Sequence, residues 1–272
     1  MLFKRRKCEQ CDAYYDPTLK ECPTCHKNNA EYGKRDISRN VLYLHPVAQG
    51  GLFLIGFAWA GMLAARYIMA LVVRGMPDSD FRNVIYMLLV YSMMFVGLLT
   101  LTLVTRRGAF FDKFKRPVDY LYGIGYAFTV LAAGTIIGGI LSLFHPTADN
   151  TNQQAIESLA GSYPIIMLLI VGFIGPICEE FTYRVGLYSF LRRINKYLAF
   201  AVTVIVFALI HFDFTATGED LINELWALPS YIVSGFVLTL AYEHRGPACS
   251  MVAHAVYNTI ALLLTFIQMY GK

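Results

Sequence analysis

Residues 163–190 read YPIIMLLIVGFIGPICEEFTYRVGLYSF, an apolar stretch that carries Glu179, Glu180 and Arg184 near its middle. A helix rises about 1.5 Å per residue, so about 20 apolar residues cross the hydrocarbon core of a bilayer. Ionisable side chains are costly at that depth and usually have a function. The stretch therefore predicts a membrane helix that carries part of a buried polar site.

The rest of the chain also has the composition of a membrane protein. It is 56% hydrophobic and 15% charged, with a mean hydropathy of +0.48 over 272 residues, which excludes an ordinary soluble domain. Further apolar segments of spanning or nearly spanning length lie at 47–73, 84–104, 118–144, 198–212, 226–242 and 248–270. We therefore predict an all-α polytopic bundle of about seven transmembrane helices over residues 47–272. No signal peptide is predicted, because the first 45 residues are polar and contain cysteines.

Lysines and arginines gather in alternate loops between these segments. They are frequent in the N-terminal tail, at 106–116, at 192–196 and at Arg245, whereas the intervening loops carry only Arg74 and Arg82. Short loops rich in Lys and Arg face the cytoplasm. The pattern predicts a multi-pass protein of the cell membrane with a cytoplasmic N-terminus and an external C-terminus.

Two CxxC pairs precede the first apolar segment; they consist of Cys8, Cys11, Cys22 and Cys25. This spacing is typical of a tetrahedral zinc site in which each pair lies on a tight turn. Two disulfides are the alternative, which a reducing cytoplasm disfavours. We predict a zinc-ribbon-like domain at residues 1–30, held together by structural zinc, and a polar linker at 31–46. A cytoplasmic protein partner for this ribbon is a further expectation.

Two loops have simpler interpretations. Residues 106–116 mix basic with aromatic side chains, and their place beside two spans predicts contact with anionic lipid headgroups rather than with nucleic acid. Residues 213–224 contain four acidic side chains, which we interpret as a solvated loop.

Three polar side chains in later apolar segments, His211, His254 and Asn258, complete a constellation with the acidic pair. Counted from the nearest basic loop, Glu180 lies about 18 Å along its helix and His211 about 22 Å. On the same count, His254 and Asn258 lie about 14 and 20 Å from their basic loop. All of them therefore reach a similar level near the bilayer midplane, as expected of one joint site.

Sequence spacing places several of these side chains on common helix faces. Glu180 and Arg184 are four residues apart, so they are predicted to form an ion pair. His254 and Asn258 have the same spacing and are predicted to be neighbours. Glu179 points about 100° away from Glu180 and is thus left to act elsewhere.

A proline and two glycines precede the acidic pair. Pro176 lacks a backbone N–H and cannot donate to the carbonyl of Gly172, and Gly175 adds further freedom. The three residues predict a kinked or opened turn, which could admit water or a substrate backbone.

These side chains suit hydrolysis by an activated water. A carboxylate and a histidine can deprotonate water and later protonate a leaving amine, while an amide and a second histidine can donate hydrogen bonds to a developing oxyanion. No Ser or Thr is paired with them as a nucleophile, and Cys178 is interpreted as a small core residue rather than a nucleophile. Zinc held by two His and two Glu is an alternative, although neither histidine belongs to an HExxH sequence.

Three short motifs carry a resemblance to a known family. EEFTYR at 179–184, FALIH at 207–211 and HAVYN at 254–258 resemble the EExxxR, FxxxH and HxxxN motifs of the CPBP family. That family contains CAAX prenyl proteases and the bacteriocin-processing or immunity proteins called Abi proteins. The resemblance covers about residues 163–265 and does not include the zinc ribbon. Family examples with eight helices leave an eighth, or a half-spanning, helix open here.

The resemblance implies an intramembrane glutamate endopeptidase that works without a metal. In that reading Glu179 resembles the base that activates water, with His211 assisting. Glu180 and Arg184 resemble the supporting ion pair of the motif.

His254 and Asn258 resemble the family's pair that stabilises the oxyanion. The implied substrates are membrane-bound or membrane-delivered peptides, and the motifs do not specify which. Two further hypotheses stay open: a non-catalytic immunity or scaffolding protein that binds a partner in the same cavity, and a proton-coupled transporter. The lack of an internal repeat counts against the transporter.

Overall fold

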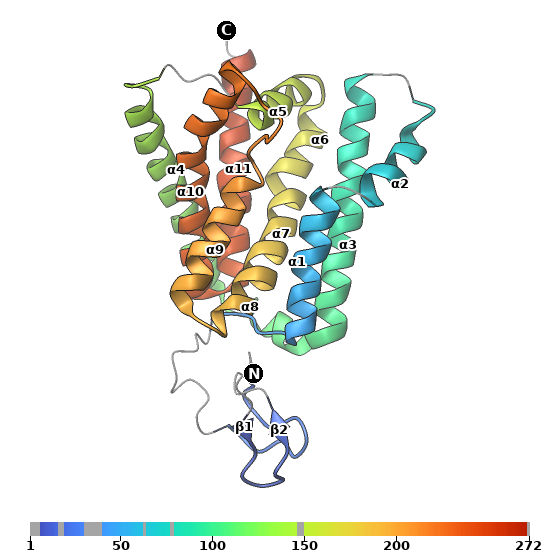
Figure 1. Ribbon diagram of the computed structural model, residues 1–272, viewed down its shortest axis with the longest axis vertical. Coiled ribbons are helices and arrows are strands. Elements are labelled where there is room, and N and C mark those ends of the chain that lie inside the picture. The colour runs from blue at the N-terminus through green and yellow to red at the C-terminus, as the bar shows by residue number, and fades with distance from the viewer. Residues whose placement is uncertain are drawn as a thin grey trace.

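The computed structural model describes residues 6–15, 19–29, 40–61, 64–76, 79–145 and 150–270. Within them, a bundle of helices follows a small N-terminal unit that contains β1 (Arg6–Lys7) and β2 (Tyr14–Tyr15) (Figure 1). The predicted all-α membrane bundle is confirmed. Five described helices are long and apolar enough to span: α3 (Asp80–Asp112), α4 (Pro117–Leu141), the composite helix Pro164–Arg192, α10 (Glu219–Arg245) and α11 (Pro247–Tyr270).

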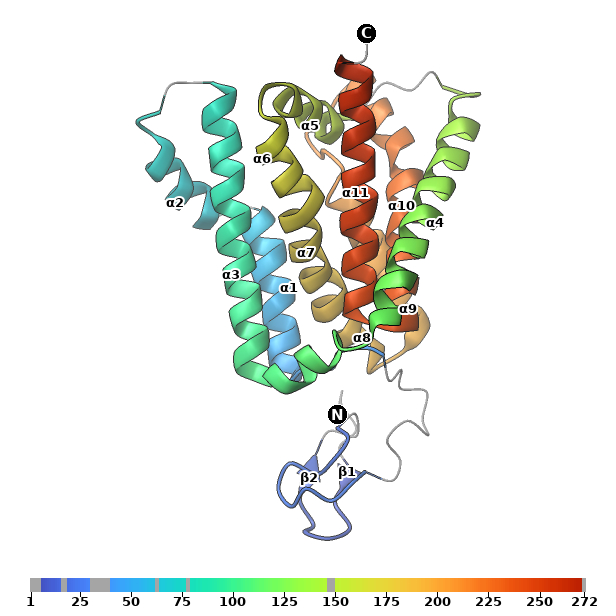
Figure 2. The same ribbon diagram turned by 180° about the vertical axis from the view of Figure 1, so that it is seen from behind.

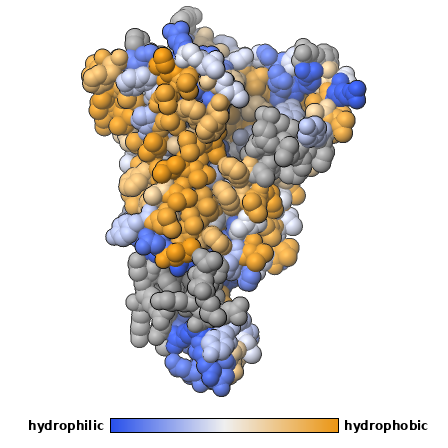
Figure 3. Space-filling view, viewed as in Figure 1, coloured by the Kyte–Doolittle hydropathy of each residue, from blue (hydrophilic) through white to orange (hydrophobic). Residues whose placement is uncertain are grey.

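On the face that Figure 3 shows, the described surface of these helices is largely apolar. Large hydrophobic side chains such as Val104, Leu143 and Ile165 are about four-fifths exposed, at 81%, 80% and 82%. In water such exposure would favour aggregation. Facing lipid, it has the character expected of a membrane-spanning surface.

The first predicted span is wrong as a single helix. Residues 47–73 form two helices, α1 (Pro46–Gly61) and α2 (Ala64–Val73), and α2 does not continue the axis of α1 (Figures 1 and 2). Close packing holds α1 within the bundle, because a Cβ atom at Gly56 would lie 1.8 Å from Oγ1 of Thr182. α2 packs against α3 instead. The short segment at 198–212 is confirmed as a short helix, α9 (Lys196–Leu209).

The composite helix is not a regular α-helix. It runs through α6 (Pro164–Leu169), η1 (Ile170–Ile174), α7 (Gly175–Glu179), η2 (Glu180–Tyr188) and α8 (Ser189–Arg192), in which η1 and η2 are wide π-helical turns. The opened turn predicted from Gly172, Gly175 and Pro176 is therefore confirmed. π-helical turns are rare and frequent at functional sites, and here one lies on each side of Glu179.

Residues 40–45 form a segment, which we call the strap, beneath one end of the bundle, and residues 41–44 of it are buried. Leu42 and Leu44 are each 1% exposed. The Leu42 N–H donates to the Tyr242 hydroxyl at 3.1 Å, and Arg106 Nη1 donates to the Tyr43 carbonyl at 2.9 Å. The prediction of a polar linker up to residue 46 is wrong for the strap, since its apolar side chains fill the bundle. Residues 31–39 lie outside the described residues.

The strap and α8 close the same end of the bundle, which we call the strap end. Arg192 on α8 donates to both carboxylate oxygens of Glu243 on α10, at 2.9–3.2 Å. Phe110, from the basic and aromatic stretch, is 8% exposed and stacks on Phe181 at 5.8 Å between ring centroids. The prediction that this stretch faces lipid headgroups is thus wrong for Phe110, which packs inward.

The opposite end, which we call the α5 end, carries α5 (Thr151–Ser162) and the start of α10 (Figure 2). Glu224 is 1% exposed there, and its carboxylate accepts hydrogen bonds from the backbone N–H of Thr151 at 2.9 Å and of Asp213 at 3.1 Å. The prediction of a wholly solvated acidic loop is therefore wrong for Glu224. Its carboxylate joins the start of α5 to the chain that follows α9.

Candidate functional site

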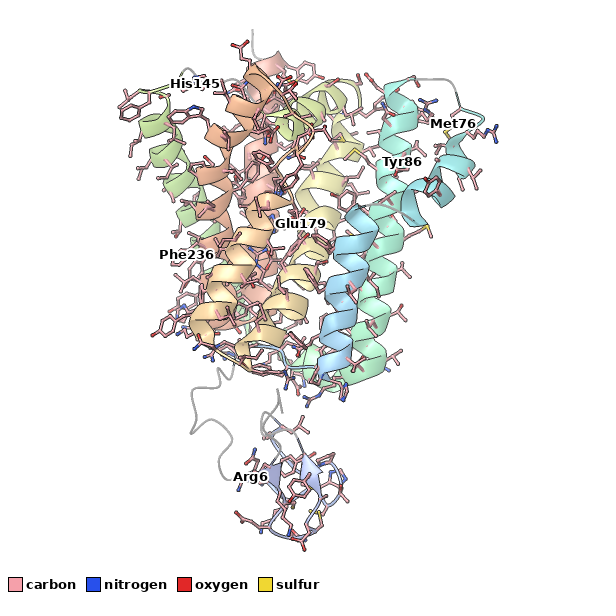
Figure 4. The ribbon with its side chains drawn as sticks, in the orientation of Figure 1. Arg6, Met76, Tyr86, His145, Glu179 and Phe236 are labelled. Carbon is pink, nitrogen blue, oxygen red and sulfur yellow. The ribbon has the colours of Figure 1, made fainter. Side chains whose placement is uncertain are left out.

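The six predicted site residues come from four neighbouring parts of the bundle. Glu179 ends α7, and Figure 4 shows it near the middle of the bundle. The others lie on η2, just after α9 and on α11; they are Glu180, Arg184, His211, His254 and Asn258. A cavity of about 1360 Å³ is lined by four of the six, Glu179, His211, His254 and Asn258.

Glu180 and Arg184 form the ion pair that their spacing predicts. Glu180 Oε1 lies 2.8 Å from Arg184 Nη1, and both side chains are 0% exposed. Arg184 also donates from Nη2 to the Gly235 carbonyl at 3.3 Å, and its guanidinium lies 4.4 Å from the centroid of the Phe207 ring. A buried ion pair is tolerated only with such additional partners.

His254 lies between the two glutamates. Its Nδ1 is 3.0 Å from Glu180 Oε1, and its Nε2 is 3.8 Å from Glu179 Oε2. The first distance is a hydrogen bond, and the second is too long for one. With Nδ1–H donated to Glu180, Nε2 of a neutral ring is an acceptor, and it carries a proton only in the imidazolium form. The site therefore holds a histidine that is oriented by one carboxylate and faces the other.

His211 is held in a different way. Its Nδ1 is 2.8 Å from the Phe207 carbonyl, which can only accept, so we assign the proton to Nδ1 and leave Nε2 as an acceptor. The ring stacks on Tyr231 at 4.4 Å and 16°, with Phe207 at 5.0 Å. Within the described chain, no hydrogen bond or ion pair joins His211 to Glu179.

Asn258 supports the opened helix. Its Nδ2 donates to the Val171 carbonyl at 3.0 Å, and Thr259 Oγ1 donates to the Gly172 carbonyl at 3.4 Å. Both carbonyls belong to η1. Side chains of a neighbouring helix commonly satisfy backbone groups where a membrane helix is irregular. The contact uses one of the two amide protons of Asn258 and leaves the other.

Two aromatic side chains, Phe207 and Tyr231, position this site. Phe207 contacts Arg184 and His211, and its ring centroid lies 5.9 Å from that of His254. Its signals in the sequence are its place in the FxxxH motif and its position four residues before His211. Tyr231, on α10, gave no signal, because one tyrosine in an apolar helix resembles an ordinary packing residue.

Cys178 belongs to the core, as the sequence predicts. It is 0% exposed, its thiol lies 3.7 Å from the Tyr91 carbonyl, and it does not line the cavity.

Among the described residues, only the four N-terminal cysteines bring the ligand atoms of three or more His, Cys, Asp or Glu side chains close together.

The four N-terminal cysteines form a cluster whose thiol sulfurs lie within 4.8 Å of one another. Each CxxC pair lies on the same kind of turn: Asp12 N–H donates to the Cys8 carbonyl at 3.0 Å, and His26 N–H to the Cys22 carbonyl at 2.9 Å. Asp12 and His26 both have φ of 58°. All four cysteines are free thiols here, so the disulfide alternative is not what the structure shows.

The thiols of this cluster influence each other's titration. Burial opposes the Cys22 thiolate, but the N–H groups of Cys25 and Thr24 and the neighbouring thiols lower the pKa of Cys22 to about 6. The N–H of Ala13 favours the Cys11 thiolate, but burial and the other three cysteines raise the pKa of Cys11 to about 12. A bound cation relieves such repulsion, so the donor set fits a metal such as zinc.

Comparison with known proteins agrees with the three motifs. Residues 161–260 match the family described as Type II CAAX prenyl endopeptidase Rce1-like. The matched segment contains all six predicted site residues. The resemblance to the CPBP family is thereby confirmed for this segment.

Several curated proteins are similar to the chain. UPF0177 protein YvdC of Lactococcus lactis subsp. lactis (strain IL1403) is 24% identical over 157 residues, which cover 57% of this chain and 55% of that protein. UPF0177 protein YxdF of the same strain is 27% identical over 54% of this chain and 80% of its own length. The UPF0177 protein in abiGi 5′ region of Lactococcus lactis subsp. cremoris is 30% identical over 39% of this chain and 41% of its own. The chain thus spans about half the length of the first of these relatives. No solved structure matches.

Proposed function

We propose that the chain is an intramembrane endopeptidase that hydrolyses peptide bonds of membrane-associated peptides or proteins with a water activated by Glu179. The observation that carries the proposal is the row Arg184, Glu180, His254 and Glu179, which reaches a cavity inside a membrane bundle. The protease family that the matched segment resembles supports the same reaction class.

Each residue of the site has a separate role in the proposed hydrolysis. Glu179 takes a proton from water as the oxygen bonds to the peptide carbonyl carbon, and it returns the proton to the amine as the C–N bond breaks. Nε2 of His211 accepts a hydrogen bond from the second O–H of that water, and this hydrogen stays on the attacking oxygen. His254 as an imidazolium, held by Glu180, donates from Nε2 to the developing oxyanion, and the second amide proton of Asn258 serves the same oxygen. No step in this scheme uses a metal.

Loss of the base is the test of this proposal. In a strain that lacks the gene, the wild type, Glu179→Gln or Glu219→Gln is restored, and the new termini of membrane proteins and peptides are mapped by mass spectrometry. Wild type and Glu219→Gln, a matched change at the start of α10, are expected to give the same fragments. Glu179→Gln is expected to give them on the order of 10²- to 10⁴-fold more slowly. Fragments formed at the wild-type rate would show that Glu179 is not the base. A Glu179→Gln strain that keeps its phenotype would favour a non-catalytic immunity or scaffolding role.

Tyr231 is expected to matter through His211. Tyr231→Leu removes the stacked ring, and the misplaced imidazole should lower the rate of cleavage about 10- to 100-fold. Tyr231→Phe keeps the ring and loses the hydroxyl contacts to Asn150 and Asn152 at 3.3–3.4 Å, so it should stay within about threefold of the wild type. Initial rates on a confirmed substrate, with melting temperatures as the control for folding, decide the matter. Equal rates for both variants would contradict a positioning role.

We further propose that the N-terminal cluster holds a structural zinc ion and that the N-terminus is cytoplasmic. The four thiols and the paired turns support the first, and the basic residues of the strap end support the second. A cytoplasmic protein partner for the ribbon remains part of the proposal.

A further inference from the structure

The cavity reaches from the middle of the bundle towards one end only. Its deep part is lined by Glu179, Tyr183, Leu238 and His254. Its other part is lined by residues of the α5 end, namely Asn150, Asn152, Gln153, Asp213, Thr215 and Asn223. Within the described residues, the strap, α8 and the junction of α10 with α11 contribute nothing to its lining. The two ends of the bundle therefore differ in their access to the site.

The strap end is closed by side chains that pack and bond tightly. Gln49 donates from Nε2 to the carbonyls of Leu42 and Val185, both at 3.3 Å, and it is 0% exposed. Tyr188 and Tyr242 are also 0% exposed and pack edge to face at 5.8 Å. These residues fill the space between Glu179 and the strap end, so a polypeptide does not reach the site from there without displacing them.

The closed end is also the basic end. The described helix ends and loops there carry Arg106, Arg107, Lys113, Lys115, Arg116, Arg193 and Lys196. The start of α10 at the α5 end carries Glu219 and Asp220 instead. Because short basic loops face the cytoplasm, the cavity is expected to open on the opposite side of the membrane.

The residues that line the cavity indicate which class of substrate it binds. Phe53, Phe57, Met87, Tyr91 and Met94 form an apolar wall beside Glu179, and the amides of Asn150, Asn152, Gln153 and Asn223 lie on the side of the α5 end. The volume of about 1360 Å³ exceeds the range of roughly 300–1,000 Å³ that small-molecule sites occupy. No Lys or Arg of the described chain lines it, so no permanently charged side chain is placed to pair with a free C-terminal carboxylate. These features suit the interior of a peptide chain.

The mouth of the cavity has a fixed rim. Asn150 is 4% exposed; its side chain accepts from Gln153 N–H at 3.1 Å and donates to the His211 carbonyl at 3.3 Å. Glu224 adds the hydrogen bonds to Thr151 and Asp213. α5 is thus tied to the residues after α9, next to one of the site histidines.

We propose that this site takes an extended, uncharged or cationic polypeptide segment that is presented from the non-cytoplasmic side of the membrane, with bulky apolar side chains near the scissile bond. The inference rests on the proposed peptidase function for its chemistry. It rests on the cavity, the closed strap end and the charge distribution for its direction. Proteins or peptides confined to the cytoplasm are excluded as substrates.

Accessibility of single introduced cysteines tests the direction. Ala227→Cys and Ala261→Cys line the cavity, and Tyr197→Cys replaces a side chain that is 80% exposed at the strap end. A membrane-impermeant charged maleimide is added to right-side-out and to inside-out membrane vesicles that contain each full-length variant. Mass spectrometry identifies the modified peptide, so the native cysteines are kept.

In right-side-out vesicles the two cavity cysteines are expected to react at least about tenfold faster than Tyr197→Cys, with the order reversed in inside-out vesicles. Reaction of Tyr197→Cys from the outside would overturn the orientation. Reaction of both cavity cysteines from the inside alone would overturn the access route. Labelling does not require catalysis, so the same labelling in a Glu179→Gln background separates this inference from the peptidase proposal. If labelling is as expected and Glu179→Gln still cleaves, the access inference stands and the proposed role of Glu179 in peptide hydrolysis is overturned.

Discussion

Replacing Arg184 by methionine is expected to lower the melting temperature of the protein in detergent by roughly 6–20 °C. The change leaves Glu180 buried, at 0% exposure, without its cationic partner. Removing one member of a buried ion pair costs about 3–5 kcal/mol, and 1 kcal/mol corresponds to about 2–4 °C in a domain of this size. The cavity left by the side chain adds to the loss, and methionine keeps that cavity small.

Two further variants make this prediction decisive. Glu180→Gln/Arg184→Met removes both charges and is expected to recover most of the lost melting temperature, because no unpaired charge stays buried. Its cleavage activity is expected to stay low, since His254 has then lost the carboxylate at 3.0 Å that orients it. Arg107→Met, at an exposed site of the strap end, is expected to change the melting temperature by less than about 2 °C. A single Arg184→Met variant as stable as the wild type would show that the pair does not hold the bundle together.

Loss of metal is expected to unfold the N-terminal ribbon. Structural zinc in small domains contributes about 10–16 kcal/mol of apparent binding free energy. The described part of this unit has a short pairing of β1 with β2, an isolated bridge between Glu21 and Asn28, and few buried side chains besides the cysteines. Chelation of the purified protein should therefore release zinc and make residues 1–30 sensitive to proteases. Metal analysis and limited proteolysis measure the two effects.

Cysteine variants separate the ribbon from the rest of the chain. Cys22→Ser is expected to purify without zinc, whereas Cys178→Ala, at a cysteine of the membrane core, should keep it. Equal zinc content in the two variants would mean that the metal is bound elsewhere or not at all. A folded ribbon after complete chelation would show that the thiols hold each other without a cation.

The sequence predicts those parts of the site that depend on contacts within a single helix. Glu180 and Arg184 meet because four residues make about one turn, and both stay together in the structure at 2.8 Å. The opened turn near Glu179 follows from the missing N–H of Pro176 and from two glycines. The motif resemblance supplied the same residues, and depth counting brought His211 and His254 to the level of the glutamates.

Contacts between helices were beyond sequence reasoning. Sequence patterns do not indicate that Tyr231 stacks on His211 or that Asn258 donates to the carbonyl of Val171. Both contacts depend on how two helices are rotated relative to each other. His254 was expected to serve the oxyanion, and the structure adds that it bridges Glu179 and Glu180. The roles of the six residues in catalysis stay predictions.

Misjudged segments share one cause. The character of their neighbours in sequence assigns Val41 and Leu42 to a polar linker and Glu224 to a solvated loop. Their burial comes from partners more than 70 residues away, such as Tyr242 for Leu42 and Thr151 for Glu224. The first span was expected to be one helix from its hydropathy, which does not register that α1 packs on η2 and α2 on α3.

The strap also sets where the chain can be cut. Asn40 donates a hydrogen bond to the His244 carbonyl, and the next four residues are buried under the helices, so a truncation that begins at Pro46 would remove part of the floor along with the tail. A construction that exchanges the metal-binding head for another domain should join it before Asn40. If the junction is placed after Asn40, the bundle is expected to lose the buried packing of the strap and to be less stable, whatever domain is attached.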